Sequence, residues 1–201
     1  MFKQSIISAA LVALLTAGAA HAATVVDTGT PDNAGSQLLL DGNDWLAGQV
    51  TFNQDLQINS VQVYLDDLFG VGGNFNVALY SDNGNKIGSQ LFSDVATYGS
   101  TGWNGLSKLN WAVSSGKYWV GIEVDAASST NLVAPQFVPN QLANTAVSWD
   151  GGSGYTYRNV SGTGLNSNLS FGLQIAAVPE PETYAMFLIG LGLVGLRARR
   201  K

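Results

Sequence analysis

Alternation of apolar and polar residues is the feature that most limits what this chain can fold into. In residues 58–65, Val61, Val63 and Leu65 alternate with Gln62 and Tyr64. A period of two places successive side chains on opposite faces of a β-strand. The same pattern recurs at 74–80, 117–124 and 170–175, and shorter candidate strands lie at 48–52, 87–93, 108–113 and 145–149. The middle of the chain is therefore predicted to be all-β.

The segments between these strands have the composition of turns. They are rich in Gly, Asn, Asp and Ser, and the runs at 82–85 and 114–116 contain residues that tolerate positive φ. No window has the spacing of an amphipathic helix. About eight to ten short strands with this alternation favour two packed antiparallel sheets, that is, a sandwich or jelly roll.

The N-terminus has the pattern of a secretory signal peptide. Lys3 precedes an apolar stretch at 6–19, and Ala20-His21-Ala22 is a small-residue cleavage site. We expect cleavage after Ala22, so residues 1–22 are a signal peptide and the rest of the chain is exported.

The C-terminus contains a second hydrophobic segment, which follows the tripeptide Pro179-Glu180-Pro181. An apolar run of thirteen residues spans 184–196, and the chain then ends with Arg197, Arg199, Arg200 and Lys201. As a helix this run covers about 20 Å, whereas the hydrocarbon core of a bilayer is about 30 Å thick. It would be a weak anchor with its cations on the cytoplasmic side. The alternatives are a permanent membrane anchor and a buried core helix.

This tail resembles the PEP-CTERM sorting signal of exported bacterial proteins. The resemblance implies a Gram-negative host that makes exopolysaccharide, processing by an exosortase, transient membrane anchoring, and delivery to the cell surface or extracellular matrix. The stretch 58–124 also resembles the β-sandwich domains that occur beside such tails. Three parts follow: a signal peptide at 1–22, a β-sandwich domain at 23–177 and a sorting segment at 178–201.

The composition of the exported domain excludes several kinds of chemistry. The chain has no Cys, and its single histidine, His21, leaves with the signal peptide, so a Ser-His-Asp or Cys-His nucleophile and a His-based zinc site are excluded. Four Lys and Arg stand against twelve Asp and Glu in residues 23–177, a net charge of −8. Nucleic-acid binding needs a basic face, so it is excluded as well. We expect no cofactor.

Aromatic residues are the candidate binding groups. An exposed ring can stack on the C–H face of a sugar, although tryptophan more often fills a core. Trp45, Trp111 and Trp149 are expected to be structural, and Trp103, in a glycine-rich loop at 99–105, is expected to be the most exposed tryptophan. The candidate carbohydrate-binding residues are Trp103, Trp119, Tyr155 and Tyr157.

Two other features could have a function. Asp and Asn cluster at 41–44 and 82–85, and such oxygen ligands suit Ca²⁺, although neither cluster matches an EF-hand loop. Glu123 and Asp125 share a strand face, and two carboxyl groups can act as acid and base in the hydrolysis of a glycosidic bond. The sequence favours a non-enzymatic surface protein that binds polysaccharide or other surface proteins. A polysaccharide-active enzyme and a calcium-dependent adhesion module are the alternatives.

Overall fold

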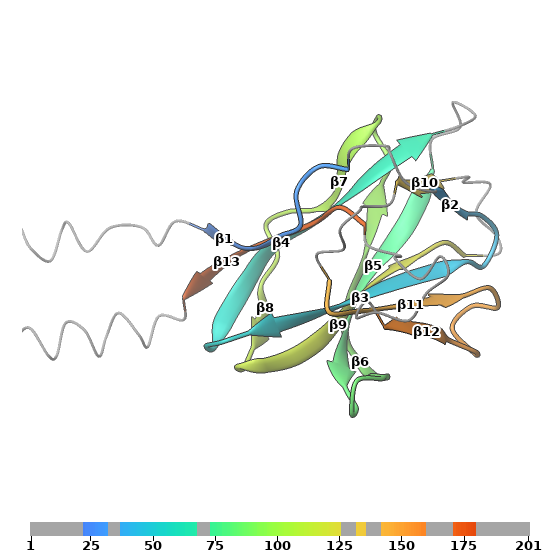
Figure 1. The fold of residues 1–201 in the computed structure, drawn as a ribbon. Helices are drawn as coiled ribbons and strands as arrows, with labels where there is room; N and C mark the ends of the chain where they lie inside the picture. The colour runs from blue at the N-terminus through green and yellow to red at the C-terminus, as the bar shows by residue number, and fades with distance from the viewer. Residues whose placement is uncertain are drawn as a thin grey trace, which may run out of the picture.

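The computed structural model describes residues 22–31, 37–67, 73–125, 132–135, 142–159 and 171–179. Within these ranges the chain is all-β and forms two antiparallel sheets packed as a sandwich (Figure 1). The strands are β1 (Ala23–Asp27), β2 (Gln37–Leu40), β3 (Trp45–Phe52), β4 (Leu56–Asp67), β5 (Asn74–Asp82), β6 (Ile87–Thr97), β7 (Gly102–Leu106), β8 (Trp111–Val113), β9 (Gly116–Glu123), β10 (Leu132–Pro135), β11 (Asn144–Ser148), β12 (Thr156–Asn159) and β13 (Leu173–Pro179).

The two sheets divide the strands between them. The seven-stranded sheet has the order β1-β13-β4-β10-β2, and β7 and β8 also pair with β4. The six-stranded sheet has the order β12-β11-β3-β9-β5-β6. The alternating residues that the sequence singles out face the space between the sheets, where Val61, Val63, Leu65 and Ile122 are completely buried. The predicted sandwich is confirmed.

The hairpin between β5 and β6 confirms the turn predicted at 82–85. Gly84 and Asn85 both have a φ of 63°, and the backbone groups of Asn83 and Lys86 bond to each other in both directions. Positive φ at both central positions is the geometry of a two-residue hairpin turn whose twist matches that of the strands.

Two regular segments differ from what the sequence predicts. Trp103 was expected in a loop, but 102–106 forms β7, in which Trp103 pairs with Tyr64 of β4. Gly105 allows this pairing because its φ is 154° and a Cβ there would lie 2.2 Å from the carbonyl oxygen of Val61. Val178 and Pro179, the first residues of the predicted sorting segment, still belong to the sandwich, because they continue β13 and pair with Gln57 and Leu56.

Both ends of the described domain lie together at one end of the sandwich. β1 pairs with β13, so Ala23 lies opposite Ala177, and Figure 1 shows the two strands side by side. The predicted hydrophobic segments at 6–19 and 184–196 lie outside the described residues. Among the residues that are described, no helix is long and apolar enough to cross a membrane.

Candidate functional site

The six-stranded sheet curls until its two edges meet. The hydroxyl of Tyr157, on edge strand β12, accepts a hydrogen bond of 3.1 Å from the backbone N–H of Ile87, on the opposite edge strand β6. In a flat sheet these strands would lie about 24 Å apart, since neighbouring strands are about 4.8 Å apart. The sheet face that points away from the other sheet is therefore concave, and we call it the concave face.

Small residues make room on the concave face for large rings. Ala47, Ala78 and Ala146 lie on three of its strands, and they pack with Tyr80 and Trp119 in a second apolar cluster separate from the main core. The Tyr157 ring meets Trp119 edge-on, with centroids 5.7 Å apart. Trp119 is 0% exposed, so the prediction that it offers an open ring for binding is wrong. Alternation correctly predicts which face of the strand Trp119 lies on, but the edges of the curled sheet cover that face.

Asp82 is the centre of a polar network on this face. Its carboxylate accepts hydrogen bonds from the Trp119 indole at 2.9 Å and from the Gln49 amide at 2.6 Å. The backbone N–H of Asn85 donates to its other oxygen at 3.1 Å. Burial acts to raise the pKa of Asp82, but these bonds outweigh burial and lower it. Asp82 therefore stays ionised and fixes the side chains around it.

The network extends across the sheet in both directions. Gln49 is almost completely buried, and its carbonyl oxygen accepts a hydrogen bond of 2.5 Å from the amide of Asn144. On the exposed side, the Lys117 ammonium donates to Asn85 at 3.0 Å. Polar groups from β3, β5, β9 and β11 are thus held in fixed positions beside the rings.

Glu123 is a buried carboxyl at the other end of the concave face. It is 4% exposed, and the Tyr80 hydroxyl donates a hydrogen bond to it. Burial raises the pKa of Glu123, and the bond from Tyr80 opposes this shift without cancelling it. Asp125, the second carboxylate of the predicted pair, is exposed and accepts a hydrogen bond of 3.2 Å from Asn76. The two acids therefore lie in very different environments.

Tyr155 and Tyr157 form the accessible rim of this site. Their ring centroids are 6.1 Å apart, Tyr157 is 38% exposed and Tyr155 is half-buried. Burial also raises the pKa of Tyr155, so its hydroxyl stays protonated. The preceding turn is held by Asp150, which accepts hydrogen bonds from the Ser148 hydroxyl and the Gly154 backbone. A hydrogen-bonded turn thus precedes the two rings, of which Tyr155 lies just before β12 and Tyr157 lies within it.

Trp45 adjoins the rim and closes one end of the site. Its ring lies 6.5 Å from that of Tyr155, and Gly152, with a φ of 84°, packs directly on it. The Trp45 indole nitrogen is buried and has no hydrogen-bond partner within the described part of the chain.

The structure brings three of the four predicted binding residues together. Trp119, Tyr155 and Tyr157 share the concave face, whereas Trp103 lies on the other sheet, half-buried and edge-on to Tyr64 with centroids 5.6 Å apart. Of the tryptophans expected to be structural, Trp111 is buried, but Trp149 is 55% exposed and replaces Trp103 as the most exposed one.

Sequence reasoning missed Tyr80 and Gln49 as parts of the site. Both alternate with core residues on strands β5 and β3, which is the usual pattern of solvent-facing positions. The accompanying alanines, at 47, 78 and 146, were the available signal, because small residues on the polar side of adjacent strands leave space for a covering layer.

The predicted calcium clusters form ordinary turns in the structure. Asp44 caps its turn by accepting a hydrogen bond of 3.3 Å from the Asp41 N–H, and burial raises its pKa. Within the described ranges, no three His, Cys, Asp or Glu residues are grouped so that they could hold a metal ion.

Comparison with known proteins identifies the C-terminal segment. Residues 177–201 match the PEP-CTERM protein-sorting motif, which begins in β13, where the sandwich ends. No curated protein matches the chain. The motif is a recognition signal for exosortase processing. The chain thus carries a PEP-CTERM sorting signal, which implies export and anchoring at the membrane by the C-terminal segment before processing at the cell surface.

Proposed function

We propose that this protein is a non-enzymatic component of the cell surface or extracellular matrix, and that it binds extracellular polysaccharide weakly through the rim of the concave face. The pair Tyr155 and Tyr157 is the observation that supports this proposal most directly. The ring of Tyr157, on β12, and that of Tyr155, just before this strand, lie 6.1 Å apart between their centroids. Exposed aromatic faces combine an apolar surface with low conformational cost, which suits sugar rings.

The polar surroundings of the rim support the same proposal. Tyr157 bonds to Ile87, so the hairpin that carries Asn85 and Lys86 lies directly beside it. Asn85 and Lys117 are exposed, and Asp82 and Gln49 hold Asn85 in place. Amide and ammonium groups fixed next to a ring can bond sugar hydroxyls without losing much entropy on binding.

A binding assay on insoluble exopolysaccharide from the native host tests this function. The double variant Tyr155→Ala/Tyr157→Ala should weaken the apparent affinity about tenfold, because two stacking contacts are lost. Tyr64→Ala/Trp103→Ala is the matched control, since it removes an aromatic pair from the other sheet. If only the control variant loses binding, the polysaccharide site lies on the seven-stranded sheet and the proposal is refuted.

The enzyme alternative depends on Glu123 and Asp125. Glu123 is covered and bonded to Tyr80, which favours a structural role for it. Release of reducing ends from the polysaccharide, abolished in Glu123→Gln, would establish the enzyme and overturn our proposal. A melting temperature that falls on addition of a chelator would instead favour the calcium-dependent module.

A further inference from the structure

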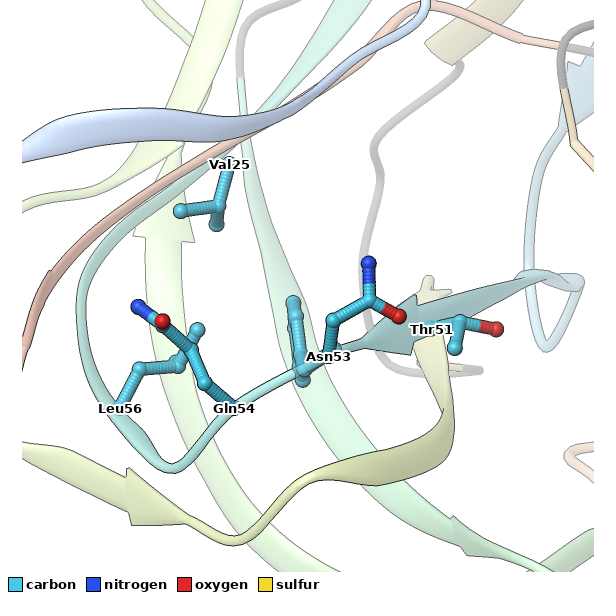
Figure 2. A pocket seen from close by; sticks show the side chains of 6 residues that line it. Val25, Thr51, Asn53, Gln54 and Leu56 are labelled. Atoms are coloured by element: carbon cyan, nitrogen blue, oxygen red, sulfur yellow. The ribbon is translucent and has the colours of Figure 1, made fainter.

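A pocket of about 280 Å³ lies at the end of the sandwich where the chain leaves the described domain (Figure 2). Phe52 and Leu56 are buried and form its apolar floor, and Val25 of β1 is an exposed apolar wall. The remaining lining residues, Thr51, Asn53 and Gln54, are exposed and polar, and none of the residues in the lining is charged. The pocket therefore suits an occupant that has both apolar and hydrogen-bonding groups.

Strand register brings the sorting segment to this pocket. The pairs Ala177–Ile58, Val178–Gln57 and Pro179–Leu56 run along β13 and β4, and Leu56 is itself part of the lining. Residue 180 is thus the first residue beyond a strand that ends beside the pocket. Three extended residues reach about 10 Å, which is enough for 180–182 to run past Asp55 and Gln54 to Asn53.

The polar side chains of the lining are available for such an occupant. Within the described residues, the side chains of Thr51, Asn53 and Gln54 have no hydrogen-bond partner. Asp55, the nearby carboxylate, accepts a hydrogen bond of 2.7 Å from the Ser115 backbone, so it is engaged with a different turn. Amide N–H groups without partners are suited to bind carboxylates.

We propose that this pocket is the docking site of the chain's own segment 180–183 in the unprocessed protein. The Pro181 ring packs against the apolar floor, and the carboxylates of Glu180 and Glu182 accept hydrogen bonds from Asn53 and Gln54. A docked segment is shielded from a processing enzyme, so release from the pocket precedes processing.

Limited proteolysis of the full-length chain in detergent micelles tests this docking. The chain contains three glutamates, Glu123, Glu180 and Glu182. With a glutamate-specific protease, the rate of cleavage after Glu182 measures how accessible the tail is. The rate of cleavage after the buried Glu123 measures how often the domain opens. In Asn53→Ala/Gln54→Ala we expect cleavage after Glu182 to accelerate about fivefold, the effect of one or two hydrogen bonds, with no change at Glu123.

The control variant is Gln37→Ala/Asn83→Ala, which removes two exposed amides far along the chain from the pocket. It should cleave at the wild-type rate. Equal rates after Glu182 in the pocket variant and wild type would overturn the proposal. If the protection of the Glu182 site from the protease disappears on dilution, the pocket binds the tail of a second copy. That result would also overturn docking within one chain.

If the Asn53→Ala/Gln54→Ala variant also unfolds the domain, a disulfide-trapping experiment tests docking independently. Because the natural chain has no cysteine, Asn53→Cys/Glu182→Cys contains a single possible pair within one chain. Docking predicts that this pair oxidises to an intramolecular disulfide at least about fivefold faster than Asn83→Cys/Glu182→Cys. Equal rates for the two pairs would reject docking.

Discussion

The indole N–H of Trp119, on β9, donates a hydrogen bond of 2.9 Å to the carboxylate of Asp82, the last residue of the neighbouring strand β5. This contact fixes a completely buried ring on a sheet face that faces away from the main core. The concave face is therefore a second, smaller core with its own polar network, and the accessible rim rests on it.

Removing the Asp82 carboxylate should destabilise this second core. Asp82→Ala removes the acceptor of the Trp119 N–H and one of the two acceptors of the Gln49 amide, and we expect a loss of about 2–4 kcal/mol in the free energy of unfolding. Urea unfolding measures it. The matched control is Asp94→Ala, which removes an exposed carboxylate whose one hydrogen bond among the described residues is to the N–H of Val95. The control should change stability by less than about 0.5 kcal/mol. Equal losses in both variants would contradict the network.

The contact that closes the curled sheet should contribute modestly. Tyr157→Phe keeps the ring on Trp119 but leaves the N–H of Ile87 without its acceptor, so we expect a loss of about 1 kcal/mol. Amide hydrogen exchange should show faster exchange at Ile87, while amides in the main core stay protected. If exchange at Ile87 is unchanged, the edges of the sheet do not meet in solution.

Glu123 should make stability depend on pH. Its pKa is raised above the ordinary value of 4.5, chiefly by burial, so the folded state binds the proton more tightly than the unfolded chain. The stabilising effect of this proton is complete below pH 4.5 and is lost as pH rises through the folded pKa. Glu123→Gln does not titrate and can still accept the Tyr80 hydroxyl. We therefore expect the variant to gain stability relative to wild type between pH 4 and pH 8, as measured by denaturant unfolding. A constant difference across this range would show that Glu123 titrates normally.

Gly152 should tolerate no side chain. An added Cβ would lie 2.2 Å from the Trp45 ring, and the φ of 84° is itself unfavourable for alanine. We expect Gly152→Ala to cost about 2–4 kcal/mol, from overpacking together with backbone strain. Gly84→Ala has a similar φ of 63° with open space around it, so it isolates the strain and should cost only about 1 kcal/mol. Thermal unfolding compares the two, and equal melting temperatures would place the Trp45 ring elsewhere.

Much of the fold was predictable because strand signals are local. Val61, Val63 and Leu65 alternate with polar residues, and each is completely buried between the sheets. The hairpin at 82–85 follows from residues that accept positive φ. The strand containing Trp103 was not predictable in this way, because its many glycines indicate a loop and pairing with Tyr64 overrides that preference.

The candidate site was predictable only in part. Tyr155 and Tyr157 emerge from the sequence as a pair because they lie two residues apart, after a glycine-rich turn. Tyr80, Gln49 and Trp45 join them only through pairing of β3, β5 and β9, which are distant in sequence.

The amino-acid sequence by itself determined the all-β class, the export and sorting of the chain, and which face of its strand Trp119 occupies, because composition, terminal motifs and alternation are properties of short segments. Only the tertiary structure decided that this face is covered. Coverage depends on how far six strands curl and on whether Tyr157 reaches Ile87. Curl accumulates from small twists over the whole sheet, so no single segment encodes it.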